Sequence, residues 1–287
     1  MFIEADWSEA GCFGEPAVVR VQRVLHAARG WIAEQERMVS LGRELALLHA
    51  ERAPPDKLEA WVRCFERILA HAPTADAPAL AATLRGVGAK VSEDVALCLA
   101  AASDVRASAA TLERARPLPR GWMLSELPVT AAPEAVQRVQ ELSVASGLAP
   151  LPGWYLRGAE GRALTLTLRD AAGQLLGAAT VCAALGPGDA AGRASGGSAQ
   201  LDLLEGGGAA LPLGLGMPVA LCLRQDARGR GFAPVLASAA MRAACERFAL
   251  RCFYAVVGSR DEIALRVAAR CGFSPHPSEC VLLAEPA

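Results

Sequence analysis

The chain has 287 residues, of which 53% are hydrophobic and 21% are charged, and its formal net charge is −1. A chain of this length and hydrophobicity can bury one large core or two ordinary ones, which excludes an intrinsically disordered protein. The near-zero net charge disfavours nucleic acid as a partner, because a broad nucleic-acid surface needs an excess of Lys and Arg.

The nine cysteines contain no Cys-x-x-Cys pair, and the chain has only four histidines. This spacing disfavours a zinc site, so we expect no metal and reduced, buried thiols. The N-terminus lacks the apolar stretch of a signal peptide. The longest uncharged run, residues 206–223, contains Pro212, Pro218 and several glycines, so it cannot form a regular membrane-spanning helix. We therefore expect a cytoplasmic protein with no membrane partner.

Residues 17–46 show an apolar pattern that repeats every seven residues, which predicts a long amphipathic helix. Such a helix fits either the seam of a coiled-coil homodimer or the interior of a helical bundle. Because one apolar row is lost at Gln35, Gly42 and His49, the bundle fits better.

Further helices are predicted after Pro54 and Pro55, which end the first helix, with Asp56 suited to cap the second. The apolar spacing places these helices at residues 58–69, 78–87 and 93–114. We therefore expect an all-helical N-terminal domain over residues 1–116, which would bind a protein partner, form an oligomer with a second copy of the chain, or cover a substrate cleft.

The sequence RPLPRG, residues 116–121, interrupts the helical pattern and predicts a boundary before a second domain over residues 117–287. Alternation and turn residues then predict a hairpin, and a Gly/Ala-rich insertion follows at about 186–216. The complete order is a strand at 121–129, a helix at 132–144, strands at 161–170, 175–185 and 217–223, a helix from 232, a strand at 251–257, a helix at 261–271 and a strand at 279–285. This order predicts a mixed α/β fold.

The sequence RQDARGRGFAPVL, residues 224–236, joins a predicted strand to a predicted helix. A helix N-terminus carries unpaired N–H groups and a partial positive charge, and preceding glycines let a ligand approach the backbone. Arg228 and Arg230 add charged donors, so a phosphate cradle competes with a plain turn and with a nucleic-acid contact. The segment is neither a Walker A loop nor a Rossmann motif, since Pro234 takes the place of the third glycine.

Two segments together resemble the GCN5-related N-acetyltransferase (GNAT) superfamily. Arg228-Gly229-Arg230-Gly231-Phe232-Ala233 matches the R/Q-x-x-G-x-G/A signature of that family, and the later segment DEIALRVAARCGF matches its next motif at Ala264, Gly272 and Phe273. The resemblance implies a mostly antiparallel sheet with flanking helices. It also implies an acyl-CoA-dependent N-acyltransferase, most simply an acetyltransferase.

The resemblance further implies where acetyl-CoA would bind. Its pyrophosphate would lie on the loop from Arg228 to Ala233, and its pantetheine arm beside Leu221, Cys222 and Leu223, in a gap before the next strand. Ser259 and Asp261 are candidates to contact that arm, and Asp261 also suits a helix cap. An amine of a small molecule or a protein would attack the thioester from the opposite side.

The sequence also departs from the family pattern. Ala268 stands where the family often has a tyrosine that serves as the general acid, and the strand at 217–223 carries no acidic residue. Tyr254 is the remaining candidate for a proton donor, with an ordinary buried tyrosine as the alternative. Two functions therefore stay open: an active acyltransferase, or an acyl-CoA-binding regulatory protein that has lost catalysis.

Overall fold

The computed structural model describes residues 11–35, 37–159, 162–184 and 214–287. Strands as well as helices form the N-terminal part of the chain, which therefore differs from the all-helical unit expected. The elements in chain order are α1 (Pro16–Ala27), α2 (Arg29–Glu34), β1 (Met38–Ser40), β2 (Leu45–Leu47), the 3-10 helix η1 (Ala50–Arg52), α3 (Pro55–Phe65), β3 (Ile68–Pro73), α4 (Ala77–Gly86), β4 (Ala89–Ser92), β5 (Val95–Ala101) and α5 (Ala102–Ala115).

Two apolar patterns account for this difference. The helix predicted over residues 17–46 is replaced after residue 34 by the hairpin β1–β2, in which Gly42 turns the chain with a φ of 79°. Strands of three residues are too short to show alternation, so their buried side chains read as part of a helical stripe. The run VALCLAA forms β5 rather than a helix, because a strand that is covered on both faces is continuously apolar.

The C-terminal part follows the predicted order closely and confirms the mixed α/β class with flanking helices. Residues 185–213, which hold most of the predicted insertion, lie outside the described residues. The elements are β6 (Met123–Glu126), α6 (Pro133–Ala145), α7 (Gly153–Leu156), β7 (Ala163–Arg169), β8 (Leu175–Ala184), β9 (Leu215–Leu223), η4 (Gln225–Ala227), α8 (Phe232–Phe248), β10 (Cys252–Gly258), α9 (Glu262–Arg270), β11 (Ser274–Pro275) and β12 (Glu279–Pro286).

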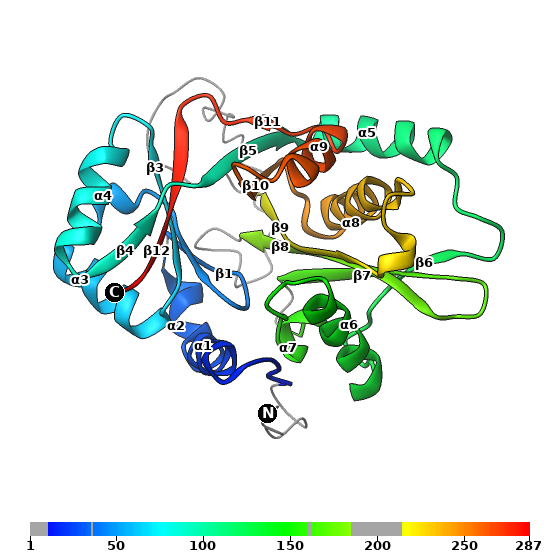
Figure 1. Ribbon diagram of the computed structural model, residues 1–287, viewed down its shortest axis with the longest axis horizontal. Coiled ribbons are helices and arrows are strands. Elements are labelled where there is room, and N and C mark those ends of the chain that lie inside the picture. The colour runs from blue at the N-terminus through cyan, green and yellow to red at the C-terminus, as the bar shows by residue number, and fades with distance from the viewer. Residues whose placement is uncertain (1–10, 36, 160–161, 185–213) are drawn as a thin grey trace.

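The strands form a five-stranded sheet, β1-β2-β3-β12-β4, and a seven-stranded sheet, β11-β5-β10-β9-β8-β7-β6. Neighbouring strands of the larger sheet are antiparallel except for β9 and β10. The N-terminal strand β5 lies between β10 and β11, and the C-terminal strand β12 lies between β3 and β4 (Figure 1). Strand pairing therefore crosses the boundary predicted at residues 116–117 in both directions.

The two parts share one repeated arrangement of elements. The order strand, helix, strand, helix, strand, strand occurs as β2-α3-β3-α4-β4-β5 and again as β9-α8-β10-α9-β11-β12. In each copy the first two strands are parallel. The last strand of each copy pairs antiparallel with the second strand of the other copy: β5 with β10, and β12 with β3. The fold is thus two similar units that exchange their last strands.

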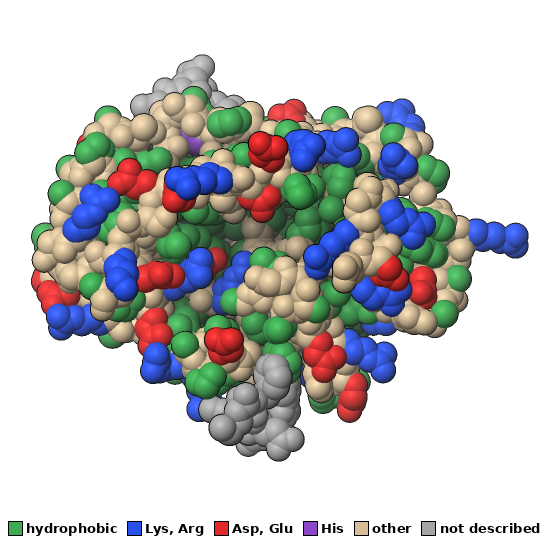
Figure 2. Space-filling view, in the orientation of Figure 1, with side chains coloured by type: hydrophobic (Ala, Val, Ile, Leu, Met, Phe, Trp, Pro, Cys, Tyr) green, Lys and Arg blue, Asp and Glu red, His purple; other side chains and the backbone are tan. Residues whose placement is uncertain are grey.

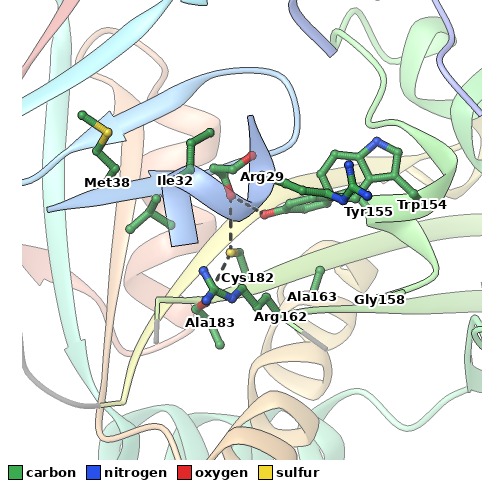
Figure 3. Close-up of a pocket in the computed structure, with 12 residues that line it drawn as sticks. Arg29, Ile32, Met38, Trp154, Tyr155, Gly158, Arg162, Ala163, Cys182 and Ala183 are labelled. Atoms are coloured by element: carbon green, nitrogen blue, oxygen red, sulfur yellow. Dashed lines mark hydrogen bonds between the residues drawn. The ribbon is translucent and has the colours of Figure 1, made fainter. Parts of the chain in front are cut away.

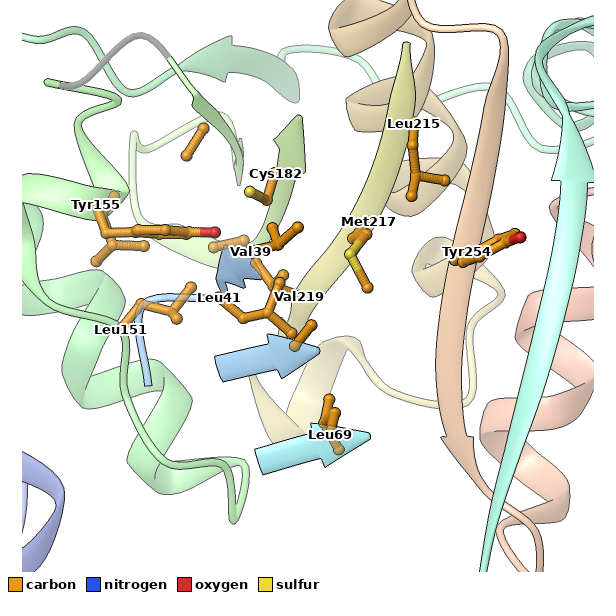
Figure 4. Packing of buried hydrophobic residues seen from close by; sticks show 14 of the residues in the cluster. Val39, Leu41, Leu69, Leu151, Tyr155, Cys182, Leu215, Met217, Val219 and Tyr254 are labelled. Carbon is orange, nitrogen blue, oxygen red and sulfur yellow. The ribbon is translucent and has the colours of Figure 1, made fainter. Parts of the chain in front are cut away.

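The buried core follows this exchange. Leu282 of β12 packs in the N-terminal core with Leu58, Phe65 and Ile68. A second cluster joins the two sheets, where Val39 and Leu41 of the N-terminal hairpin lie beside Val219 of β9 (Figure 4). Among the described residues, no helix has the length and apolar character needed to cross a membrane.

The exchange predicts that the two parts unfold together. Leu282 is 2% exposed, so Leu282→Ala should lower the free energy of unfolding by about 2–5 kcal/mol through lost burial and the cavity left behind. Ile263→Ala is the control, because Ile263 is 70% exposed and its loss should cost less than about 0.5 kcal/mol. In urea unfolding, tryptophan fluorescence and far-UV circular dichroism should give one coincident transition in both proteins. Two separate transitions, only one of them moved by Leu282→Ala, would contradict this.

Candidate functional site

A gap opens in the larger sheet between β9 and β10. The two strands, which the structure describes throughout, pair at Leu215–Cys252 and Gly216–Phe253 and then separate. Gly216 permits this close start, because a Cβ at this position would lie 2.5 Å from the Phe253 ring. Each strand keeps its outer neighbour, since β9 pairs with β8 and β10 pairs with β5. The gap is therefore held open from both sides.

A cavity of about 590 Å³ fills this gap. Figure 2 shows the molecule hollowed near its centre, with hydrophobic side chains in the hollow. Residues 218–223 of β9 and 255–258 of β10 form two walls, while α8 and α9 contribute Ala233, Met241 and Ala264 from one face of the sheet. Arg43 and Leu148 line it from the other face. The cavity thus has walls on both faces of the sheet.

The backbone of β9 turns hydrogen-bonding groups toward the gap. The Arg224 N–H donates to the Leu176 carbonyl, so Leu176 and Arg224 form a hydrogen-bonded pair of the β8–β9 ladder. Hydrogen-bonded and non-hydrogen-bonded pairs alternate along an antiparallel ladder. The next pair, Gly177–Leu223, and the pair Ala179–Leu221 are therefore non-hydrogen-bonded. The N–H and C=O groups of Leu221 and Leu223 consequently point away from β8. The Leu223 carbonyl accepts a hydrogen bond from Arg228 Nε, while the groups of Leu221 face the gap, where an extended ligand can pair with them.

A β-bulge interrupts β9 further toward its start. Thr180 lies opposite Ala220 and Val181 lies opposite Pro218, so Val219 is an extra residue in β9. The Val219 carbonyl accepts a hydrogen bond of 2.7 Å from the Arg43 guanidinium. The bulge is thus tied to a side chain from the N-terminal hairpin.

The glycine-rich loop leads from β9 into α8. Gly231 precedes the helix with a φ of 81°, and Gly229 has a φ of 70°, a left-handed conformation that favours glycine. No atom outside the adjacent residues lies within 4 Å of the position that a Cβ on Gly229 would take. The first N–H groups of a helix have no partner within it and carry a partial positive charge. The loop therefore has open backbone at Gly229, where an anion could approach.

The arginines of this loop have different surroundings. Arg228 lines the cavity and donates to the Leu223 carbonyl over 2.9 Å and to Ser146 Oγ over 3.0 Å. Arg230 stacks over the rings of Trp122 and Phe232, 5.6 and 5.4 Å from their centres, an arrangement that favours a cation. Arg230 is outside the residues that line the cavity, and the phosphate contact expected of it stays a prediction.

Arg116 is a neighbour of the loop that sequence reasoning missed. A Cβ built on Gly231 would lie 3.5 Å from Arg116 Nε. Arg116 belongs to the segment RPLPRG, whose composition signals only an interruption of the helix. Its approach to Gly231 depends on how α5 packs against α8, which no local pattern reveals.

Helix α9 covers part of the cavity. Asp261 Oδ1 accepts hydrogen bonds from the N–H groups of Ile263 and Ala264, over 3.1 and 2.9 Å, so Asp261 caps the helix and also lines the cavity. Ser259 is outside the residues that line the cavity, and its N–H donates to the Asp94 carbonyl. Ala268 lines the cavity at the position where the resemblance places a tyrosine.

Tyr254 lies away from the cavity. Its side chain is 3% exposed, its hydroxyl lies 3.4 Å from Glu279 Oε2, and its ring packs against His71 and His276. Burial, with the nearby Glu279 carboxylate, raises the pKa of the Tyr254 hydroxyl above its usual range. The alternation of β10 points Phe253 and Ala255 to the α8 face, and Tyr254 to the opposite face. The structure therefore does not bring this candidate proton donor to the other site residues.

The cavity thiols are poor nucleophiles. Burial raises the pKa of the Cys222 thiol, which lies within hydrogen-bonding reach of Ser143 Oγ and the Ala178 carbonyl. Burial also raises the pKa of Cys271 to about 12. The reactive species of a cysteine is the thiolate, so both thiols stay unreactive near neutral pH. The described residues contain no group of three or more His, Cys, Asp or Glu side chains arranged to hold a metal ion.

A smaller cavity of about 30 Å³ lies between the N-terminal hairpin and α7. There the Tyr155 hydroxyl and the Cys182 thiol both donate to the Ser40 carbonyl, over 3.1 and 3.7 Å (Figure 3). Gly42 packs directly on the Tyr155 ring, since a Cβ at this position would lie 2.9 Å from Tyr155 Cγ. A space of this size holds about two waters. Its walls hold the hairpin in place beside the larger cavity.

Comparison with known proteins agrees with this architecture. No family model and no curated protein matches the sequence. Among solved structures, a GCN5-related N-acetyltransferase from Kribbella flavida is similar with a TM-score of 0.51 and 13% identity, over 93% of this chain and 96% of that chain. A Drosophila protein is similar with a TM-score of 0.50 and 12% identity, over 94% and 89%. A tandem GNAT protein from the clavulanic acid biosynthesis pathway gives a TM-score of 0.48 and 15% identity, over 84% and 74%. The chain has a GNAT-like fold.

The contacts of His71 predict how the free energy of unfolding depends on pH. His71 is 1% exposed, and neither ring nitrogen has a hydrogen-bond partner among the described residues. Burial, with the nearby His49 and His276, lowers the pKa of His71 to about 3. An unfolded histidine binds a proton below about pH 6.5, so between these pKa values the unfolded state binds more protons. The free energy of unfolding should therefore fall as the pH falls, by about 1.4 kcal/mol per pH unit from this residue.

His71→Phe removes the titrating group and keeps a ring beside Tyr254. Urea unfolding at about pH 7 and about pH 5 should show a loss in the wild-type chain that exceeds the loss in the variant by about 2 kcal/mol. Equal losses in the two proteins would contradict the assignment.

Proposed function

We propose that the chain is an acyl-CoA-dependent N-acyltransferase, most simply an acetyltransferase. The observation that carries the proposal is the cavity between β9 and β10, which leads directly to the glycine-rich loop at the start of α8. One end of this cavity suits an anion, and its walls combine free backbone groups with apolar side chains. A long ligand with a phosphorylated end has these properties.

The residues present fit coenzyme A. Its pyrophosphate would meet the backbone of Gly229 and Gly231 and the guanidinium of Arg228. Its extended arm would pair with the N–H and C=O groups of Leu221. The apolar face of α9 that borders the cavity is half-exposed, and none of the residues of this helix is fully buried. A bound ligand would remove this face from water.

The transfer would be direct. The amine nitrogen attacks the thioester carbonyl carbon, a C–N bond forms, and the C–S bond breaks. Coenzyme A leaves as a thiolate, which is protonated, and the nitrogen loses a proton to give the amide. The raised pKa of both cavity thiols supports this route over an acyl-enzyme. Entry of the amine from the side opposite the coenzyme stays a prediction.

The acceptor is proposed to be an amine of a small molecule or a protein. Binding of a second copy or a protein partner through the N-terminal helices stays a prediction. The same holds for Tyr254 as a proton donor, for which the contacts with Glu279 and the two histidines give no support.

A second function fits the same cavity: an acyl-CoA-binding protein without catalysis. Ala268 in the cavity wall favours it, because a family tyrosine is replaced there. Asp261, the carboxylate among the described cavity residues, caps α9, which also favours it. Thiol release from acetyl-CoA over a panel of amines, measured beside calorimetric binding, separates the two. Turnover supports the enzyme, whereas tight coenzyme A binding without turnover supports the binding protein.

Gly229→Glu tests the phosphate assignment. The new carboxylate would lie in the open space before α8 and repel the pyrophosphate, so affinity for coenzyme A should fall at least about 100-fold. The control is Gly88→Glu, because Gly88 also has a positive φ, at 84°, and open space around it, but lies after α4. In thermal melting the control should lower the midpoint temperature as much as Gly229→Glu does. In calorimetry it should bind coenzyme A normally. Normal binding by folded Gly229→Glu would overturn the assignment.

A further inference from the structure

Arg43 joins three segments of the chain at the wall of the large cavity. It lies in the turn of the hairpin β1–β2, and its guanidinium donates to the Val219 carbonyl over 2.7 Å and to the Ala149 carbonyl over 2.9 Å. The first carbonyl belongs to the bulge of β9, and the second to the loop between α6 and α7. The Arg43 side chain is 18% exposed and lines the cavity.

Contacts within and around the hairpin fix the position of the Arg43 guanidinium. Glu44 Oε1 lies 3.7 Å from Arg43 Nε, and Glu44 Oε2 lies 3.0 Å from Arg67 Nε. The turn closes through a hydrogen bond from the Leu41 N–H to the Glu44 carbonyl. Tyr155 fixes the hairpin by its hydroxyl, bonded to the Ser40 carbonyl, and by its ring against Gly42. Because the hairpin is anchored on both sides, Arg43 has a fixed position.

The bulge that Arg43 contacts lies in the part of the cavity where the reacting end of the coenzyme is expected. The glycine-rich loop lies beyond Leu223, at the end where β9 and β10 are apart, and the strands meet at Leu215 and Gly216. A coenzyme anchored at the loop extends along Leu223 and Leu221 toward the narrow end. Its thioester, at the far end of the arm, therefore comes to the segment around Val219.

We infer that Arg43 is a positioning residue for acyl transfer, supplied by the N-terminal part to the C-terminal cavity. This inference rests on the proposed function. Arg43 holds the bulge at Val219 in one conformation and keeps a positive charge beside the place where negative charge develops on the thioester oxygen. A fixed charge or donor in such a position lowers the barrier more than it strengthens substrate binding.

Arg43→Gln is the test, with Arg67→Gln as the matched control. Both substitutions remove a guanidinium next to Glu44, but Arg67 is outside the residues that line the cavity. Arg43→Gln should lower kcat by about 10–100-fold while the Kd for coenzyme A stays within about threefold. Arg67→Gln should keep kcat within about twofold. Added guanidinium should partly restore the rate of Arg43→Ala, because it can donate again to the Val219 carbonyl and return the positive charge.

A second measurement does not depend on turnover. Amide hydrogen exchange of the segment 217–223, without ligand, should be faster in Arg43→Gln than in the wild type and unchanged in Arg67→Gln. If the wild type transfers no acyl group, the proposed function fails, and exchange alone then decides whether Arg43 holds the bulge. An unchanged exchange rate overturns the inference in every case. So does an unchanged kcat in an active enzyme, or a loss of coenzyme A affinity as large as the loss of kcat.

Discussion

The exchange of last strands between the two repeats is the constraint on which the other features depend. Strand β10 pairs with β5 along all seven of its residues, so it has a complete ladder on one side and can leave β9 on the other. Without β5, the departure of β10 from β9 would leave a strand with few backbone partners, which is costly in a sheet interior. The exchange also places the N-terminal hairpin against β9. Both the gap between β9 and β10 and the cavity wall that the hairpin forms therefore depend on the strand exchange.

The two repeats have the same order of elements but different chemistry at corresponding junctions. Between β9 and α8 the chain has Gly229 and Gly231 and presents open N–H groups. Between β2 and α3 it has Pro54 and Pro55, with Pro55 as the first residue of the helix. Proline has no N–H and its ring fills the space that a ligand would need. The C-terminal repeat thus carries the junction that is proposed to bind an anion, while the N-terminal repeat supplies a supporting strand and a wall.

Sequence reasoning succeeded where local chemistry decides the structure. The element order after residue 117 follows from long strands with clear alternation, and the left-handed glycines before α8 follow from residue type. It failed for the N-terminal part, where strands of three residues are too short for any pattern. It could not find Arg43 or place Tyr254, because both depend on sheet order. Val219 lies beside Arg43 only because the hairpin packs on β9. Tyr254 of the larger sheet meets His71 of β3 only because the two sheets pack together.

The pairing of β3 with β12 has a consequence for how the protein is made. Most of the chain separates these two strands, so β3 and β4 leave the ribosome long before the strand that joins them. Until then the N-terminal half carries unpaired edges and lacks Leu282 in its core, which is the kind of species that aggregates or recruits a chaperone. Closing so long a loop also slows folding. The two halves therefore complete their folding together, after β12 has been synthesised.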